Sequence, residues 1–280
     1  MADNQQPVPA RKPRGVRGEL RDDRFVGGHD LTRWKSRPGR LLAGSAHHIS
    51  RLLGPYTALV LTLALGLAIA LTLTVASAEV YEAVQDSDDV AVLDQPLLNT
   101  VKALRSPALD TAVTGYTNIG GVYGMPILAV LTMAVLAFRR QSWTPVILVA
   151  AAGGGALLMT ISSKQLIGRH RPSLADAVPP YEYSASFPSG HTLNATVIAG
   201  IVAYLLILRQ HTVLARTLTI TAATVFAMSM GLSRVFLGHH WFTDVLVAWT
   251  LGLAWLALVI TAHRLYLTAR QRNTTSKTHP

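Results

Sequence analysis

The stretch SRVFLGHHWFTD, residues Ser233–Asp244, places two histidines shortly before a carboxylate. His240 and Asp244 are four positions apart, a spacing that puts both side chains on one face of a helix. A carboxylate that holds one imidazole nitrogen fixes the tautomer and stabilises the charge that develops as the other nitrogen attacks. His240 is therefore the candidate nucleophile and Asp244 its orienting partner, whereas His239 points elsewhere on the helix. Taken alone, the pair also fits an ordinary surface ion pair. Arg234 adds a planar donor suited to a phosphoryl group.

A second cluster, FPSGHT, directly precedes a long apolar run. Ser189 and Gly190 fall where the first, unsatisfied turn of a helix is expected, and such a terminus binds phosphate through free amides and the helix dipole. Gly190 lets the backbone approach a ligand closely, and the Ser189 hydroxyl can donate or cap. His191 follows as a candidate general acid. By itself this cluster is better explained by an ordinary serine cap with a solvent-facing histidine, because such caps are commonplace.

A third cluster, KQLIGRHRP, closes another apolar run. Six residues separate Lys164 from Arg171, which is two helical turns, so both cations face the same way if the helix persists. Pro172 then ends the helix. Snorkelling at a membrane edge is the simpler interpretation of such residues, but the charge distribution described below disfavours it. Cations retained here indicate an anionic ligand.

Together the clusters form an inventory for in-line phosphoryl transfer. Cations and amides hold the phosphoryl oxygens, one histidine attacks, and another protonates the leaving oxygen. The competing use of histidines is a zinc site, but the sequence has no HExxH and no three-ligand set near the cations. We therefore expect no metal and no other cofactor.

The elements that must position these residues are apolar runs near the ~20-residue length that crosses a bilayer. Charged residues make up 14% of the 280 residues, against about 25% in soluble domains, and cysteine is absent. The expected fold class is all-α, a polytopic membrane helical bundle with six transmembrane helices. The runs lie at roughly 56–78, 120–138, 143–163, 192–208, 217–237 and 242–263.

Basic residues are distributed unevenly between these runs. With six alternating spans, nineteen of the 25 Lys and Arg fall on one side, eleven of them before the first span. The positive-inside rule then places both termini in the cytoplasm and the three clusters at an extracytoplasmic-facing active site. The net charge of +10 is thus a topology signal, and we expect no nucleic-acid partner.

This pattern divides the chain into three parts. Residues 1–54, rich in Pro, Gly and Arg, are expected to form a disordered basic cytoplasmic tail compatible with contact to anionic lipid. Residues 55–263 are the six-span domain, and residues 264–280 a short cytoplasmic C-terminal tail. Residues 94–119 have the mixed pattern of short helices on the outer surface. The glycines at 153–155 permit close helix approach, within one chain or between two, so the oligomeric state stays open.

The three clusters resemble the signature of the type 2 phosphatidic acid phosphatase family, whose active site is shared with vanadium haloperoxidases and glucose-6-phosphatase. That signature has Lys, six residues and Arg-Pro; then Pro-Ser-Gly-His; then Ser-Arg, five residues, His, three residues and Asp. Every position matches, from Lys164 to Asp244. The first fifty residues have no counterpart in it.

This resemblance implies a role for each matching residue. His240 would form a phosphohistidine with the help of Asp244, and His191 would protonate the leaving group and later activate water. The phosphoryl oxygens would be bound by Lys164, Arg171, Ser189, Gly190 and Arg234.

The implied activity is that of an integral membrane lipid phosphatase that releases inorganic phosphate from a lipid in the bilayer. Bacterial members that resemble this chain act on phosphatidate, phosphatidylglycerophosphate, diacylglycerol pyrophosphate or polyprenyl pyrophosphates such as the undecaprenyl carrier of cell-wall synthesis. Two alternatives remain open from the sequence. One is a sugar-phosphate lipid or a soluble phosphate ester as substrate, and the other is a non-catalytic membrane protein that retains a phosphate-binding site. The intact His191 and His240–Asp244 pair disfavour the second.

Overall fold

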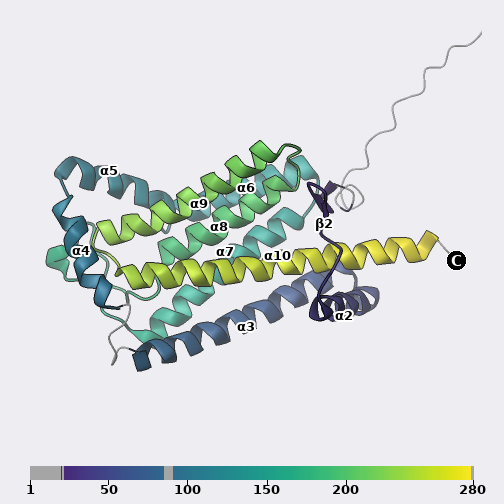
Figure 1. Cartoon of the computed structure of the whole chain (residues 1–280), viewed down its shortest axis with the longest axis horizontal. Coiled ribbons are helices and arrows are strands. Elements are labelled where there is room, and N and C mark those ends of the chain that lie inside the picture. The colour runs from purple at the N-terminus through teal and green to yellow at the C-terminus, as the bar shows by residue number, and fades with distance from the viewer. Residues whose placement is uncertain (1–19, 21, 85–90, 279–280) are drawn as a thin grey trace, which may run out of the picture.

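The computed structural model describes residue 20, residues 22–84 and residues 91–278, and it is a bundle of long helices (Figure 1). Its long helices run side by side, and short elements close the two ends. The helices longer than one short turn are α2 (Arg37–Leu53), α3 (Pro55–Val84), α4 (Asp94–Ala103), α5 (Pro107–Thr117), α6 (Gly124–Arg140), α7 (Thr144–Ile167), α8 (Gly190–Ile207), α9 (Val213–Phe236) and α10 (Phe242–Thr278). Three 3-10 turns are η1 (Ala91–Leu93), η2 (Asn118–Gly120) and η3 (Leu174–Asp176), and a two-stranded antiparallel hairpin pairs β1 (Phe25–Val26) with β2 (His29–Asp30).

Among the described residues, four helices are long and apolar enough to cross a membrane: α7, α8, α9 and the Phe242–Arg272 part of α10. A fifth span results if α5 with η2 and α6 form one element, bent by 47°. The first predicted run lies in α3, whose apolar stretch Tyr56–Thr72 is shorter. The helical fold class is thus confirmed with four to five candidate spans, and the number six stays a prediction.

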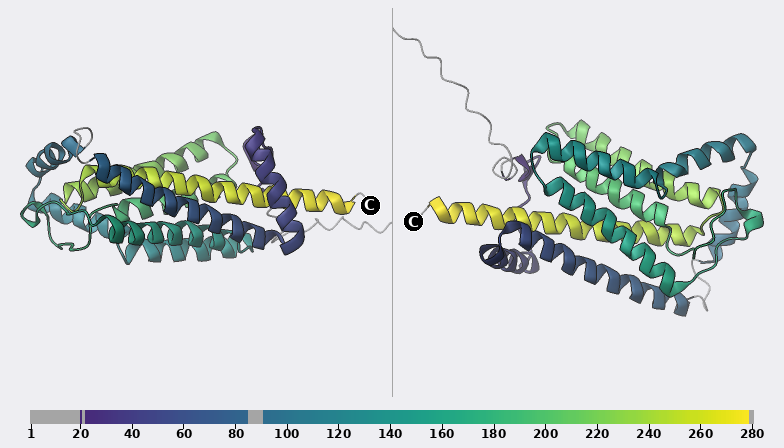
Figure 2. Two further views of the ribbon diagram at one scale, coloured as in Figure 1. Left: turned by 90° about the horizontal axis from the view of Figure 1, so that it is seen from below. Right: turned by 180° about the vertical axis from the view of Figure 1, so that it is seen from behind.

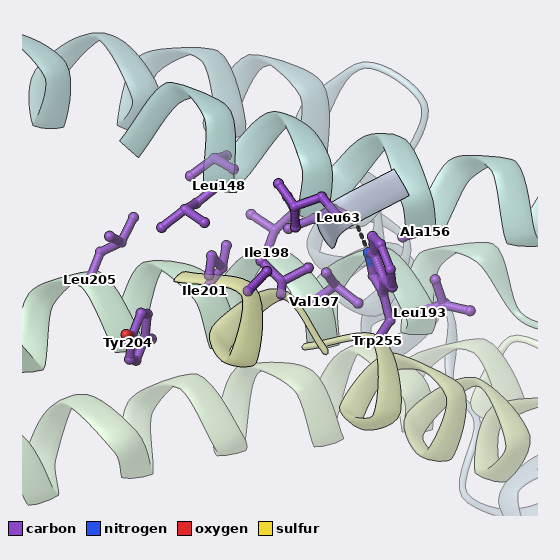
Figure 3. Packing of buried hydrophobic residues seen from close by; sticks show 14 of the residues in the cluster. Leu63, Leu148, Ala156, Leu193, Val197, Ile198, Ile201, Tyr204, Leu205 and Trp255 are labelled. Atoms are coloured by element: carbon purple, nitrogen blue, oxygen red, sulfur yellow. Dashed lines mark hydrogen bonds between the residues drawn. The ribbon is translucent and has the colours of Figure 1, made fainter. Parts of the chain in front are cut away.

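One close contact joins α7 and α10 in the core. Trp255 on α10 is 1% exposed, and its Nε1 donates to the Ala152 carbonyl of α7 at 3.0 Å (Figure 3). A Cβ at Gly155 would lie 2.4 Å from Trp255 Cε2, so only glycine admits the indole at this position. This member of the 153–155 run therefore serves packing within the chain.

The N-terminal segment differs from expectation. Residues 1–19 and 21 lie outside the described part, but from residue 22 onward the segment predicted to be a disordered tail forms the hairpin and α2. The buried Asp23 pairs with Arg140 at 3.2 Å and with Arg209 at 2.5 Å, which joins the segment to the ends of α6 and α8. Ser36 caps α2 by accepting from Gly39 N at 3.2 Å. Ordering this segment costs conformational entropy, and its composition alone suggested that it would stay disordered. The contacts with the bundle offset that entropy cost.

The C-terminal boundary differs as well. We expected a separate short tail from residue 264, but α10 continues without a break to Thr278. By contrast, α4 and α5 fall within the 94–119 segment where short helices were expected. They lie at the opposite end of the bundle from α2, the hairpin and the C-terminus (Figures 1 and 2).

Candidate functional site

The three clusters converge at the α4 end of the bundle, where α7, α8, α9 and α10 begin or end. α7 ends at Ile167 because Gly168 adopts a positive φ of 59°. The loop 168–189 then leads into α8, and a turn at residues 237–241 joins α9 to α10. Residues up to 80 positions apart in the sequence thereby share one buried site.

His240 and Asp244 contact each other as predicted, but from a different local structure. His240 lies in the turn just before α10, and Asp244 in that helix's first turn, so the two do not share a helical face. His240 Nδ1 is 3.4 Å from Asp244 Oδ2, and both residues are at most 1% exposed. Trp241 N donates to the same carboxylate oxygen at 3.1 Å. The helix start thus fixes the carboxylate on the Nδ1 side of the imidazole.

The other nitrogen of His240 faces the cations. Its Nε2 lies 3.2 Å from Arg171 Nη1. Since α7 ends at Ile167, Arg171 stands in the loop and does not extend the helical face of Lys164, as the spacing had suggested. The two cations meet through the loop instead. Lys164 Nζ donates to the Ala185 carbonyl at 2.6 Å, and Arg171 Nε donates to that of Ser184 at 2.7 Å.

Arg234 approaches from the end of α9 and is 1% exposed. Its Nη1 donates to Thr117 Oγ1 at 3.3 Å. Its Nε, also buried, has no hydrogen-bond acceptor within the described part of the chain. A buried guanidinium N–H without a protein acceptor is costly, and it is a donor available to a ligand oxygen.

The start of α8 agrees with the prediction only in part. Ser189 precedes the helix and is fully buried, but its hydroxyl accepts from Thr192 Oγ1 at 2.8 Å and caps no backbone amide. The Ser189 amide, expected to be free for phosphate, donates to the Asp244 carbonyl at 3.3 Å. Gly190 opens the helix against Thr160, whose Cγ2 would be 3.1 Å from an added Cβ. His191, on the first turn, interacts electrostatically with Arg234 and Glu182.

Sequence reasoning missed Glu182, which lies among the cations. One of its carboxylate oxygens pairs with Arg234 Nη2, and the other lies 2.8 Å from Arg171 Nη2. Burial alone would raise the pKa of this carboxyl, but Arg234 and Arg171 together lower the pKa of Glu182 to about 2. One signal could have revealed it, because Glu182 is the single acid between Asp176 and Asp244.

Two residues that support Asp244 were also missed. Arg169 Nη1 lies 2.5 Å from Asp244 Oδ1, and its Nη2 lies 2.8 Å from Asp94 Oδ2 on α4. The Ser186 hydroxyl donates to the other oxygen of Asp244 and lies 3.4 Å from His240 Nδ1. The carboxylate is therefore held from two sides, in a relay that links α4 to the imidazole.

His239 faces away from this pair. Its Nε2 lies 2.7 Å from the Val178 carbonyl, and its Nδ1 is 3.9 Å from Glu182. The two adjacent histidines thus have different partners, although neither lies on a helix as the spacing had suggested. His240 is fully buried, and its burial, reinforced by Arg171 and Arg234, holds its pKa well below the usual value. The imidazole is neutral near pH 7, the state that a nucleophile requires.

These features define a helical membrane protein with a neutral histidine facing a cluster of buried cations. The PAP2 superfamily model matches residues 127–266, and the chain belongs to that family. It is similar to phosphatidylglycerophosphatase B of Bacillus subtilis, with 33% identity over 185 residues that cover 64% of this chain and 88% of the relative. It also resembles the crystal structure of a transmembrane PAP2-type phosphatidylglycerolphosphate phosphatase from Bacillus subtilis, with a TM-score of 0.57 and 30% identity, covering 70% of this chain and 92% of the other. The chain is accordingly a membrane enzyme of the phosphatase class.

Proposed function

We propose that this protein hydrolyses a lipid phosphate or pyrophosphate through a phosphohistidine at His240 and releases inorganic phosphate. The observation that carries the proposal is the orientation of one imidazole. His240 Nδ1 faces Asp244 at 3.4 Å, while Nε2 faces the Arg171 guanidinium at 3.2 Å. An acid on one side and an anion-binding group on the other is the arrangement of a nucleophilic histidine.

The chemistry then proceeds in two displacements. His240 Nε2 attacks phosphorus, the bond to the leaving oxygen breaks, and His191 donates a proton to that oxygen. Asp244 stabilises the positive charge on His240, while Lys164, Arg171 and Arg234 hold the equatorial oxygens. In the second step His191 takes a proton from water, the water oxygen attacks phosphorus, and the bond to Nε2 breaks to release phosphate. The free Nε of Arg234 and the amide of Gly190 are the donors best placed to gain a partner when phosphate binds.

In this scheme Glu182 must give up its contacts with Arg171 and Arg234 when phosphate binds. Its two oxygens pair with Arg171 and Arg234, the same guanidinium groups that the phosphoryl oxygens require. A bound phosphate would replace the carboxylate as their partner, because a dianion competes effectively with a single carboxylate for paired guanidinium groups.

The proposed topology has six spans, with α3 as the first, both termini in the cytoplasm and the site on the extracytoplasmic side. The distribution of Lys and Arg in the sequence supports it, because with six alternating spans nineteen of the 25 fall on the side of the two termini. Scanning accessibility of single cysteines to a membrane-impermeant reagent in intact cells tests this directly. Labelling is expected at Tyr183→Cys, because Tyr183 lies on the site loop and is 82% exposed, and none is expected at Gly28→Cys in the hairpin.

Among substrates, we favour phosphatidylglycerophosphate, because the similar Bacillus subtilis protein bears the name of that activity. Phosphatidate and a polyprenyl pyrophosphate complete the set to be compared. We also propose that no metal takes part, since the cations that neutralise the phosphoryl group are already supplied by side chains. In the described part of the chain, no three His, Asp or Glu side chains gather in a way that could hold a metal ion.

The deciding experiment measures phosphate release from these three lipids in detergent with EDTA present. The full chain is compared with His240→Ala, and samples quenched in alkaline detergent are examined for a base-stable, acid-labile phosphoprotein. Release that persists in EDTA and disappears in the variant supports the proposal. Release that EDTA abolishes, or that His240→Ala retains, contradicts it.

A further inference from the structure

The helix α2 lies outside the region that the family model matches, and its sequence carries three separate faces. Small residues recur at spacings of four, three and four positions, and these are the buried ones: Gly39, Ala43, Ala46 and Ser50. A second face is leucine-rich and exposed, and a third is basic. Helices with adjoining apolar and basic faces typically lie in a membrane interface.

The small-residue face docks α2 onto the bundle. Ala43 and Ala46 pack with Leu265 of α10, and Trp34 joins the same cluster. Trp34 Nε1 also donates to Thr268 Oγ1 at 3.0 Å. A Cβ at Gly39 would lie 2.6 Å from the Trp34 ring, so glycine is required for this approach. The position and rotation of α2 are thereby fixed relative to the spans.

The docking point lies one bilayer thickness from the active site. From Phe242, beside the site, to Leu265 the α10 helix advances roughly 35 Å at 1.5 Å per residue, against about 30 Å for the hydrocarbon core. α2 crosses α10 there at a steep angle and runs across the bundle end (Figure 2). A helix oriented across the spans at this depth lies along the membrane surface opposite the site.

The rotation of α2 leaves four of its leucines exposed. Relative exposures are 74% for Leu41, 50% for Leu42, 70% for Leu52 and 57% for Leu53. Four leucines exposed to water on one helix would be an unusually large apolar patch for a soluble surface. At the level of the interface, the same patch is placed to enter the acyl region.

The basic face supplies the complementary charge. Arg37, Arg40 and Arg51 are all exposed and lie on one side of the helix, and α2 contains no acidic residue. Cationic side chains beside an inserted apolar face meet lipid phosphates, and each contributes about 1 kcal/mol of attraction to an anionic leaflet. An uncharged apolar partner would not explain why this face of α2 is basic.

We propose that α2 is an interfacial anchor that inserts Leu41, Leu42, Leu52 and Leu53 into the leaflet opposite the active site and binds anionic phospholipid headgroups through Arg37, Arg40 and Arg51. The site is independent of the catalytic residues, and it depends only on the spans crossing a bilayer. The enzyme would thus contact lipid phosphates on both membrane surfaces, with catalysis at one and attachment at the other.

Depth is tested by spin labelling, since the chain has no cysteine that would interfere. Nitroxides are attached to Leu41→Cys and Leu52→Cys of the full chain in phosphatidylglycerol–phosphatidylcholine bilayers. Leu131→Cys on α6 serves as the bilayer reference and Gly28→Cys as the aqueous one. We expect oxygen accessibility to exceed that of a water-soluble nickel chelate at both α2 positions, as at the bilayer reference. Values like those of the aqueous reference overturn insertion, and protection from both reagents overturns it in favour of a covering protein surface, such as a second copy.

Headgroup preference is tested with a fluorophore on Ser45→Cys, quenched by brominated phosphatidylglycerol or brominated phosphatidylcholine. We expect phosphatidylglycerol to bind beside α2 in preference to phosphatidylcholine. This preference should fall about fivefold for each arginine replaced by glutamine. The triple Arg37→Gln, Arg40→Gln, Arg51→Gln chain should show little preference, and the triple lysine chain should retain most of it. Equal quenching by the two lipids in the chain with all three arginines would overturn the headgroup site. If the triple lysine chain loses the preference as fully as the triple glutamine chain, the electrostatic basis of the headgroup site is overturned.

Discussion

Arg169 Nη1 lies 2.5 Å from Asp244 Oδ1, so the carboxylate beside His240 is itself held by a cation that the signature positions do not include. The same guanidinium reaches Asp94 of α4 at 2.8 Å. Asp94 also accepts from the Thr243 amide at 2.9 Å. The start of α10, the site loop and α4 are therefore joined at a point directly behind the proposed nucleophile.

We predict that Arg169→Gln lowers kcat by roughly one to three orders of magnitude, with a smaller effect on KM. Arg169 pairs with Asp244, so its loss should affect the reacting histidine more than substrate binding. Arg169→Lys should recover part of the loss by restoring a charge. The measurement is steady-state kinetics on purified variants. A rise in KM with kcat unchanged would show instead that Arg169 contributes to binding.

The two adjacent histidines should differ sharply on substitution. Asp244→Asn removes the charge that stabilises His240, and we expect a loss of roughly two to four orders of magnitude in kcat. His239→Gln should retain most activity, because this ring contacts the Val178 carbonyl and not Asp244. Glutamine preserves a donor for that carbonyl, which makes it a better comparison than alanine. Comparable losses in the two variants would contradict the assigned roles.

Glu182 is predicted to oppose anion binding in the free site. Glu182→Gln removes a carboxylate from between Arg171 and Arg234, and we expect orthovanadate to inhibit about tenfold more tightly as the cations lose their competing partner. Asp176→Asn is the matched control, since that acid lies on the same loop but pairs with Lys102. Inhibition constants for the three chains are to be compared at one ionic strength. Weaker inhibition in Glu182→Gln would show that the carboxylate shapes the site and does not compete within it.

We predict that the acid limb of kcat/KM reports the protonation of His240. Burial, together with Arg171 and Arg234, holds the pKa of His240 well below its ordinary 6.5, and only the neutral ring attacks. Activity should therefore persist as the pH falls through 6.5 and decline only at lower values. Removing one nearby positive charge in Arg171→Gln should raise the pKa of His240 and move the limb to higher pH. Measuring both chains on one substrate cancels the ionisation of the substrate, and an unchanged limb would exclude His240 as its source.

The sequence was sufficient for the parts of the site that depend on local spacing. His240 and Asp244 meet because four residues separate them, and the turn before α10 preserves this proximity although His240 is not helical. The pairing of Lys164 with Arg171 was inferred from a helix that in fact ends at Ile167, yet the loop returns both cations to the same place. That the three distant motifs cluster could be expected because they were predicted to lie on the same side of the membrane. The individual contacts between them could not be predicted.

The contacts made by loops and by the N-terminal segment could not be predicted from the sequence. Glu182 reaches the cations only because the 168–189 loop folds back across the bundle end, and no periodicity describes that path. Likewise, Asp23 is buried where it pairs with Arg140 at the end of α6 and with Arg209 in the turn after α8. The composition of residues 1–54 predicted a disordered tail, because it could not show that the bundle end provides packing partners for residues 22–54.

The glycine run in α7 permits a last prediction on stability, in which neighbouring positions serve as controls for each other. A Cβ at Gly155 would lie 2.4 Å from Trp255 Cε2, whereas a Cβ at Gly154 meets nothing within 4 Å. Gly155→Ala must displace an indole that is 1% exposed and hydrogen-bonded to Ala152, and we expect destabilisation of about 1–3 kcal/mol from overpacking.

Gly154→Ala should be neutral or stabilising by up to about 1 kcal/mol, since alanine favours helix and no atom obstructs it. Thermal unfolding in detergent, followed by circular dichroism, is the appropriate measurement, with both chains at equal concentration. Trp255→Phe in the Gly155→Ala background should recover part of the loss because the smaller ring leaves room for the methyl group. If the two alanine variants unfold at the same temperature, α7 and α10 are not packed through this contact, and the helix pairing that supports both sides of the site would need revision.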